Sequence, residues 1–326
     1  MKILICDKLD KITIEELQKL GTCIDVSQDK DKSKKIKENI IDAEIVLVRS
    51  DTQINKELLD VSKKLKIIGR SGVGTDNIDI EEASIRNIYV TNTPEANVIS
   101  AAELTIGLLI SAARNIAVAN NSVKNNEWER SEFIGVELYK KQLGLIGFGK
   151  VAKLVSKRMQ SFDMKIVFYD PFIDSSTENE EKVELEELLK TSDFISIHVP
   201  KNKETINLVS KEKLSIAKEG SIIINTSRGG LIDEQEVFNL VNENKLYSAG
   251  FDVYEKEPPE MSEEKNRSKV ITLPHLGAST KEAQARAGQQ LVENIKNILN
   301  EDLSSCLLYT SPSPRDQRGS RLPAWA

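Results

Sequence analysis

Three segments of the sequence each place a charged side chain just past a run of residues typical of a buried β-strand. The charged residues are Arg228, Glu257 and His275. An arginine can hold a carboxylate through paired hydrogen bonds, a histidine can take a hydroxyl proton, and a glutamate can orient the imidazole and stabilise its cation. Taken singly, each has an ordinary alternative as a turn cap, a solvated loop charge or a strand-end residue. Together they predict reversible oxidation of an alcohol beside a carboxylate.

The chain contains two histidines, so any imidazole chemistry falls on His275 or on His198. His198 follows the apolar run Phe194–Ile197 and is predicted to be a structural strand-end residue. The three cysteines and two histidines have no spacing that resembles a metal site, so no metal is expected.

A glycine-rich turn is the strongest local signal in the sequence. A predicted strand enters it and a predicted helix, Lys150–Ser161, leaves it, while Gly147, Gly149 and Ala152 occupy the G-x-G-x-x-G/A positions. The first glycine permits a tight turn, and the second lets a pyrophosphate approach the backbone at the helix N-terminus. A structural strand–helix turn can use the same pattern, but the context favours dinucleotide binding.

An acidic residue at the end of the next predicted strand supports that interpretation. Asp170 follows the run Lys165–Tyr169 and lies 21 residues after Gly149 (170 − 149), close to the expected spacing of about 20. A carboxylate there accepts hydrogen bonds from the ribose hydroxyls and repels a 2′-phosphate. Pro171 and Phe172 follow, without a basic residue to bind that phosphate, so the sequence favours NAD over NADP.

The elements that must position these residues alternate along the chain. Short β-branched runs separated by helical patterns predict an α/β fold with two doubly wound parallel sheets. The predicted strands are Lys2–Cys6, Ile45–Val48, Lys66–Ile68, Ile88–Val90, Gln142–Ile146, Lys165–Tyr169, Phe194–Ile197, Ser221–Ile224, Ser248–Phe251 and Val270–Thr272. Two long helices are predicted at Asn97–Asn121 and Ser279–Leu299, and the second is expected to return to the first domain.

These patterns predict a substrate-binding domain made of residues 1–96 and 280–303, and an NAD-binding domain of residues 97–279. Residues 304–326 have no periodic pattern and are interpreted as a foreign or disordered tail. With 326 residues and 39% hydrophobic residues, the chain is long enough for two cores. Its net charge of −6 argues against a nucleic-acid partner. The sequence lacks an apolar run long enough for a membrane span or a signal peptide, so a cytoplasmic protein is expected.

The residues quoted above resemble those of the D-isomer-specific 2-hydroxyacid dehydrogenase family, from Met1 to about Leu303. This resemblance implies Rossmann-like domains with the active site in the cleft between them, and His198 as a wall near the nicotinamide. It implies a catalytic trio of Arg228, Glu257 and His275, with His275 as the acid/base. The implied cofactor contacts are Gly147, Gly149, Lys150, Val151, Asp170, Val199, Thr226, Ser227, Asp252, Gly277 and Ala278.

Within the family, the chain most resembles the phosphoglycerate dehydrogenases. The turn after Gly69 could form an anion-binding concavity from its N–H groups. The resemblance implies a small phosphorylated 2-hydroxy acid as substrate, oxidised in the first step of serine biosynthesis. The implied substrate-binding residues are Arg49, Ser50, Arg70, Ser71, Gly72 and Asn97.

The sequence leaves two alternative functions open, and it raises one expectation about subunit contacts and one about regulation. The same scaffold would suit a glyoxylate or hydroxypyruvate reductase or a D-lactate dehydrogenase, and some relatives are NAD(H)-binding corepressors. The segment Lys124–Arg130 resembles a loop that reaches a neighbouring subunit, which implies a homodimer or homotetramer with Trp128 and Arg130 at the interface. The C-terminal serine-binding domain of longer relatives is not expected here, and neither is its feedback regulation.

Overall fold

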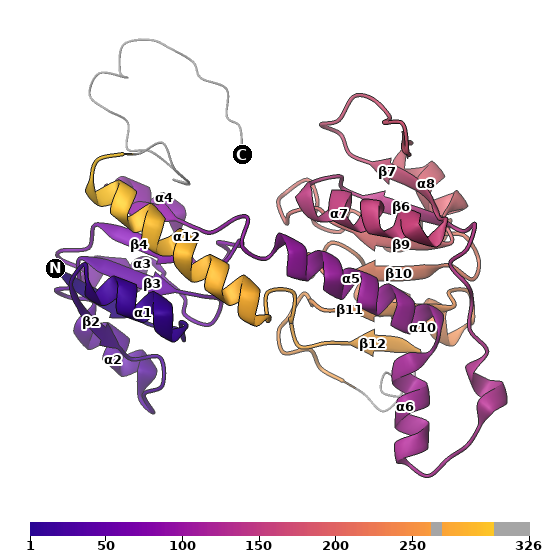
Figure 1. The fold of residues 1–326 in the computed structure, drawn as a ribbon, viewed down its shortest axis with the longest axis horizontal. Helices are drawn as coiled ribbons and strands as arrows, with labels where there is room; N and C mark the ends of the chain where they lie inside the picture. Colours follow the sequence, from indigo (N-terminus) through magenta and orange to yellow (C-terminus); the bar gives the residue numbers. More distant parts are fainter. Residues whose placement is uncertain (262–268, 303–326) are drawn as a thin grey trace. The chain divides into compact units, whose positions relative to one another are not determined.

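The structure is a computed structural model that describes residues 1–261 and 269–302. The chain divides into two compact units. Of the described residues, the first unit contains Met1–Asn97 and those from Thr280 onward, and the second contains those within Val98–Ser279. Figure 1 shows that each unit has its own sheet and its own helices. The predicted tail of residues 304–326 lies outside the described residues.

The first unit is built on a five-stranded parallel sheet in the order β2-β1-β3-β4-β5. This is the flavodoxin-like strand order. Successive strands are added on one side of β1 and then, from β3 onward, on its other side. The strands are β1 (Lys2–Ile5), β2 (Thr22–Asp25), β3 (Ile45–Val48), β4 (Ile67–Arg70) and β5 (Tyr89–Thr91). The helices are α1 (Lys11–Gln18), α2 (Lys32–Asn39), α3 (Lys56–Val61), α4 (Ile80–Ile85) and α12 (Lys281–Leu299).

Helices cover both faces of this sheet because its strands are apolar on both sides. On one face, buried residues of α1 and α12 such as Leu17, Leu291 and Ile295 pack against β1, β3 and β4. On the other, α2, α3 and α4 cover the alternate strand residues. Figure 1 shows α12 alongside α1, although most of the chain separates them in sequence. The last described helix therefore completes the core of the first unit.

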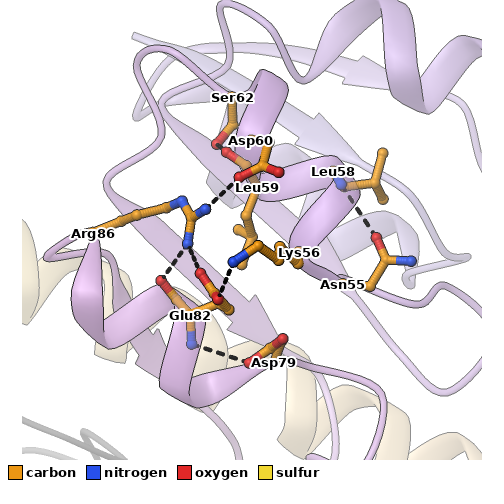
Figure 2. Close-up of polar contacts among 9 residues, drawn as sticks. All are labelled: Asn55, Lys56, Leu58, Leu59, Asp60, Ser62, Asp79, Glu82 and Arg86. Carbon is orange, nitrogen blue, oxygen red and sulfur yellow. Dashed lines mark hydrogen bonds and ion pairs between the residues drawn. The ribbon is translucent and has the colours of Figure 1, made fainter.

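Charged side chains join α3 to α4 on the surface of the first unit (Figure 2). Arg86 forms ion pairs with both Asp60 and Glu82, and Lys56 Nζ lies 2.6 Å from Glu82 Oε1. Exposed pairs of this kind contribute little each, but a network can align two short helices. Because these charged side chains pair with one another, they need no ligand to explain their presence here.

The second unit is built on a seven-stranded parallel sheet in the order β12-β11-β10-β9-β6-β7-β8. Its strands are β6 (Gln142–Ile146), β7 (Lys165–Tyr169), β8 (Glu180–Lys182), β9 (Phe194–Ile197), β10 (Ile222–Asn225), β11 (Ser248–Phe251) and β12 (Val270–Thr272). Its helices are α5 (Val98–Ala113), α6 (Ile116–Lys124), α7 (Lys150–Met159), α8 (Leu185–Thr191), α9 (Lys211–Leu214) and α10 (Glu234–Asn242), with short 3₁₀ turns at Arg130–Phe133 and Gln160–Phe162.

Two apolar clusters lie on the two faces of this sheet. Ile222 and Ile224 of β10 pack on the side covered by α5 and α7, and Ile223 between them packs on the side covered by α8, α9 and α10. This alternation follows from the two-residue period of a strand. The sheet is buried on both faces, so its rims are where ligands can reach it.

The predicted fold class, α/β with two doubly wound parallel sheets, is confirmed. Every predicted strand is present within about two residues of its expected bounds, but β2 and β8 were not among them. Both are short edge strands, and β8 consists of Glu-Glu-Lys. Charged edge strands are common because they discourage pairing with another chain, and they carry no apolar period.

The prediction of one helix over Asn97–Asn121 is wrong. Two helices, α5 and α6, replace it and meet at a bend of 65°. Asn115 at the bend adopts a left-handed backbone conformation with φ of 54°, and its Nδ2 donates to Tyr247 Oη at 2.6 Å. Asparagine tolerates this conformation better than most residues, and a side-chain partner far away in sequence stabilises it.

Within residues 1–261 and 269–302, no single helix is long and apolar enough to cross a membrane, and one bent pair, α5 with α6, meets the criteria of length and composition.

Candidate active site

The predicted site residues of the second unit all lie at one edge of its sheet. Because the strands are parallel, all their carboxyl ends and following loops are at that edge. The strand order reverses between β6 and β9, where an open α/β sheet has its ligand-binding crevice. Cofactor candidates follow β6, β7, β9, β10, β11 and β12, and the candidate trio follows the last three of these strands.

The two glycines of the turn between β6 and α7 differ in the space around them. Gly147 has φ of +87°, and a Cβ there would lie 2.7 Å from the carbonyl oxygen of His198 and 2.8 Å from Val199 Cγ1. Chain packing alone therefore requires Gly147. A Cβ at Gly149 would meet no atom of the described residues within 4 Å, and its φ of −77° suits any residue.

Gly149 is thus a glycine that the chain itself does not need. It precedes α7 directly, where the backbone N–H groups of a helix N-terminus and the helix dipole favour an anion. A close approach by a phosphate explains the missing side chain better than a structural turn does. Lys150 is exposed and Val151 is partly buried, both in the first turn of α7. The residues present therefore fit the pyrophosphate of a dinucleotide.

Asp170 at the end of β7 holds the same turn from the side. One carboxylate oxygen accepts the N–H of Phe148 at 2.9 Å, and the other accepts the N–H of Phe172 at 2.9 Å. Phe148 also stacks on Phe168, with ring centroids 4.1 Å apart. A carboxylate has about four acceptor sites, so two remain for the hydroxyls of a ribose.

The loop after β10 is held by side chains rather than by a helix. Asn225 Nδ2 donates to the carbonyl oxygen of Arg228 at 2.8 Å, and Asn225 Oδ1 accepts the N–H of Ser227 at 3.1 Å. The Ser227 hydroxyl donates to the Ile197 carbonyl oxygen at 2.9 Å, and the Thr226 hydroxyl lies 2.7 Å from that of Thr105. These bonds fix the backbone from which the Arg228 side chain extends.

Glu257 and His275 form the pair that the sequence predicted. His275 Nδ1 lies 2.8 Å from Glu257 Oε2. Because a carboxylate only accepts hydrogen bonds, the neutral imidazole carries its proton on Nδ1, and Nε2 is left to accept a proton. The side chains of His275 and Glu257 are 44% and 39% exposed, so Nε2 can be reached by a small molecule.

Asp252, at the end of β11, positions the loop that carries His275. Its carboxylate accepts the N–H groups of Leu276 at 2.7 Å and of Gly277 at 2.8 Å. Burial raises the pKa of Asp252, against the lowering effect of these two hydrogen bonds. His275 itself has a positive φ of 55°, which the two bonds help to maintain. Ala278 follows in the same loop.

His198 lies on the same edge but is unsuited to proton transfer near neutral pH. Burial lowers its pKa to about 4, and its Nε2 lies 2.9 Å from the Ser196 hydroxyl. It is therefore neutral across the physiological range. Its carbonyl oxygen closes over Gly147, which gives it a structural role in the turn.

The first unit presents its own predicted residues at the carboxyl ends of β3, β4 and β5. Arg49 and Ser50 follow β3, and a carboxylate that the sequence did not single out holds that loop. Asp7 accepts the N–H of Arg49 at 2.6 Å and the hydroxyl of Thr52 at 2.6 Å, and it pairs with Lys32 at 2.5 Å.

Asp7 is almost fully buried. Burial alone would raise its pKa, but the hydrogen bonds from Lys32, Thr52 and the Arg49 backbone outweigh burial and lower it. Its position directly after the apolar run Ile3–Cys6 was the available signal, because it repeats the strand-end pattern of Asp170 and Asp252.

Arg70 ends β4, and its guanidinium lies over Gly72. A Cβ at Gly72 would be 1.7 Å from Arg70 Nη1, and its φ of +149° also favours glycine. Ser71 is buried and donates its N–H to the Val48 carbonyl oxygen at 2.9 Å, which ties this turn to β3. Asn97 is partly buried and ends the chain segment that follows β5. The structure thus groups Arg49, Arg70 and the turn after β4 at one rim.

In the described parts of the chain, no group of three or more His, Cys, Asp and Glu side chains could hold a metal ion. Arg228 and the Glu257–His275 pair lie at the same edge of the second unit's sheet as the Gly147–Gly149 turn.

Comparison with known proteins agrees with this geometry. Residues 106–277 match the model of the D-isomer specific 2-hydroxyacid dehydrogenase NAD-binding domain. The hydroxypyruvate reductase of Thermotoga maritima is 44% identical, over 82% of this chain and 87% of that protein. The chain belongs to the D-isomer specific 2-hydroxyacid dehydrogenase family. The prediction of NAD as cofactor is confirmed by the same match.

Other relatives are longer than this chain. The D-3-phosphoglycerate dehydrogenase of Methanocaldococcus jannaschii is 41% identical over 99% of this chain, but the match spans 62% of that protein. The same enzyme of Archaeoglobus fulgidus is 40% identical over 91% of this chain, and 57% of it is matched. The chain therefore spans about three fifths of the length of these relatives.

Solved structures share the fold. The TT0316 protein of Thermus thermophilus is 27% identical, with a TM-score of 0.87 over 95% of this chain and all of that one. The D-lactate dehydrogenase of Aquifex aeolicus, solved with NAD and lactic acid, is 25% identical with a TM-score of 0.80, over 94% of this chain and 99% of that one.

The two glycines of the turn should respond differently to replacement by alanine. Gly149→Ala should fold normally and weaken NADH binding about tenfold or more, because the added methyl group meets only the ligand. Gly147→Ala should lower the melting temperature, because the methyl group collides with the His198 backbone. NADH fluorescence titration and thermal unfolding measure the two effects. Unchanged NADH affinity in Gly149→Ala would contradict pyrophosphate binding at this turn.

Proposed function

We propose that the chain is an NAD-dependent oxidoreductase that acts at carbon 2 of a small D-2-hydroxy acid. The observation that supports this most directly is the 2.8 Å contact between His275 and Glu257. It lies on the sheet edge that carries the Gly147–Gly149 turn and Asp170, so an acid/base pair and a dinucleotide site share one rim.

The residues have complementary roles in the proposed reaction. Bound NAD supplies the acceptor for the hydride that leaves carbon 2. His275 Nε2 takes the hydroxyl proton, and Glu257 stabilises the resulting imidazolium through Nδ1. The Arg228 guanidinium binds the α-carboxylate and polarises the neighbouring oxygen, which favours the carbonyl product. In the reverse direction, His275 returns the proton.

The first unit suggests which hydroxy acid is used. We propose that Arg49 and Arg70 bind a phosphate, with Ser50, Ser71, Gly72 and Asn97 as further contacts. A phosphate carries nearly two negative charges and pairs well with two guanidinium groups. The similarity to D-3-phosphoglycerate dehydrogenases over nearly the whole chain supports the same substrate. The proposed reaction is oxidation of D-3-phosphoglycerate to 3-phosphohydroxypyruvate, the first step of serine biosynthesis.

A second candidate is reduction of hydroxypyruvate. It is favoured by the similarity to the T. maritima hydroxypyruvate reductase, which this chain matches over most of the length of both proteins. The chemistry at carbon 2 is the same in both candidates. They differ in whether a phosphate must be bound, and hence in what Arg49 and Arg70 do.

A panel of 2-oxo acids with and without a 3-phosphate separates the two candidates. NADH consumption should be fastest, at low substrate concentration, with 3-phosphohydroxypyruvate. Arg49→Ala should raise KM for this substrate about tenfold or more and leave kcat nearly unchanged, because the phosphate contact is the same in the ground state and the transition state. Its KM for hydroxypyruvate should not change. An equal KM effect on both substrates would refute the phosphate assignment.

The role of His275 can be tested separately from cofactor binding. His275→Ala should reduce kcat by about 100-fold or more, since a positioned acid/base contributes roughly 10²–10⁴-fold. NADH affinity should stay within about twofold. Glu257→Gln should lose less activity, because the amide oxygen can still accept the Nδ1 proton. If His275→Ala turned over substrate as fast as the wild type, a group other than His275 would have to accept the hydroxyl proton.

We also propose that a second copy of the chain binds the segment around α6. Trp128 and Ile134 in this segment are each 76% exposed, and Val123 is 54% exposed. Such neighbouring exposed apolar side chains mark an interaction surface. Arg130, at the start of the 3₁₀ turn between Trp128 and Ile134, would lie at the rim of this contact.

Replacing Trp128 by glutamate should therefore shift the protein toward monomer in sedimentation velocity at micromolar concentration. The matched control is Ile85→Glu in α4 of the first unit, where the isoleucine is 74% exposed. It should leave the oligomeric state unchanged. A monomeric wild-type protein, or an equal effect of both variants, would contradict the proposal.

A further inference from the structure

Glu234, the first residue of α10, lies where two candidate catalytic loops meet. Its Oε1 accepts the N–H of Gly230 at 3.3 Å and the N–H of Glu255 at 2.9 Å. Gly230 belongs to the loop that carries Arg228, and Glu255 belongs to the loop that carries Glu257. A single carboxylate oxygen thus joins the backbones of both loops.

The two loops are in direct backbone contact beside this carboxylate. A Cβ at Gly229 would lie 1.8 Å from the carbonyl carbon of Tyr254 and 2.3 Å from the nitrogen of Glu255. Glycine at position 229 therefore lets the loops approach, and Glu234 bridges them where they approach. A change in this bridge alters the spacing of one loop from the other.

From Glu255 the hydrogen bonds continue to the acid/base pair. The N–H of Tyr254, the residue before Glu255, donates to Glu257 Oε1 at 3.2 Å, and Glu257 Oε2 contacts His275. Glu257 and His275 are both partly exposed, so packing alone does not fix them. The placement of His275 thus depends on the backbone that Glu234 holds.

Helix capping does not explain Glu234. Asp233 is already the N-cap of α10 and accepts the N–H of Glu236 at 2.9 Å. Glu236 supplies a second acidic residue in the first turn and pairs with Lys211 at 2.9 Å. The needs of the helix terminus are therefore met by these two neighbours.

The carboxylate is also costly to keep at this place. Burial is the main cause that raises the pKa of Glu234, the nearby Glu255 carboxylate adds to it, and the two N–H groups and Lys201 act against it. A side chain whose ionised form is disfavoured by burial needs a compensating role, and its two backbone partners indicate one.

We propose that Glu234 is a positioning residue that sets the spacing between Arg228 and the Glu257–His275 pair. This inference rests on the proposed dehydrogenase function. In this proposal Glu234 acts through the backbones of the two loops, and not through a contact with substrate or cofactor. Displacing a reacting group by about 1 Å can cost roughly 100-fold in rate, so a loosened bridge reduces turnover rather than cofactor affinity.

Three variants test the proposal. Glu234→Ala removes the acceptor, Glu234→Gln keeps an amide oxygen in its place, and Glu236→Ala is the control that removes an acid from the same helical turn. Steady-state kinetics with NADH and the best 2-oxo acid give kcat and KM for each. Hydrogen–deuterium exchange of the Tyr254–Glu257 segment reports the hold on the loop without any turnover.

Glu234→Ala should lower kcat about tenfold or more with NADH affinity within about twofold, and should speed amide exchange in the Tyr254–Glu257 segment. Glu234→Gln and Glu236→Ala should stay near wild type in both measurements. Wild-type kcat in Glu234→Ala, unchanged exchange in this variant, or a loss in Glu234→Gln as large as in Glu234→Ala would overturn the proposal. If the wild-type chain reduced none of the 2-oxo acids, the dehydrogenase proposal would fail. The exchange experiment would still show whether Glu234 holds the Tyr254–Glu257 segment.

Discussion

A parallel sheet places the carboxyl ends of all its strands along one edge, and the second unit uses this constraint over most of its width. Asp170 and Arg228 are far apart in sequence, yet their strands, β7 and β10, are separated by only two others. At about 4.8 Å per strand, the two residues are roughly 14 Å apart along the edge. Strand order alone therefore sets the spacing between the carboxylate proposed to bind the ribose and the arginine proposed to bind the substrate.

Loops at this edge are irregular, and carboxylates accepting backbone N–H groups hold them in place. Asp170 holds the glycine turn, Asp252 holds the His275 loop, and Glu234 joins two loops to each other. Asp7 does the same for the Arg49 loop of the first unit. One carboxylate can accept several N–H groups, so a single buried residue replaces the regular bonds that a loop lacks. The reactive side chains are therefore positioned by residues that do no chemistry themselves.

Much of this could be predicted from the sequence because the signals are local. Strands such as Gln142–Ile146 and Phe194–Ile197 are apolar and β-branched over most of their length, and the glycine turn with Asp170 has a fixed spacing. The strand-end positions of Glu257 and His275 predicted that both lie at one edge of the sheet, and the family resemblance implied that they pair. Features that depend on partners distant in sequence were not predictable. The bend at Asn115 is stabilised by Tyr247, and Glu234 accepts the N–H of Glu255, a contact that no pattern in its own segment indicates.

The burial of Asp252 and Glu234 has a consequence for how a more thermostable form of this fold could evolve. Their pKa values are raised in the folded chain, so the stability that each contributes is fully present below its unfolded pKa and is lost as pH rises through its folded pKa. Ionisation of these two buried carboxyl groups as the pH rises therefore weakens the fold, although their oxygens hold the loops in place. Replacements that remove the charge together with the hydrogen-bond acceptor, such as alanine, would avoid this cost of ionisation but would release the backbone N–H groups of the loops. The same two residues would then limit how far this scaffold can become more stable without becoming slower.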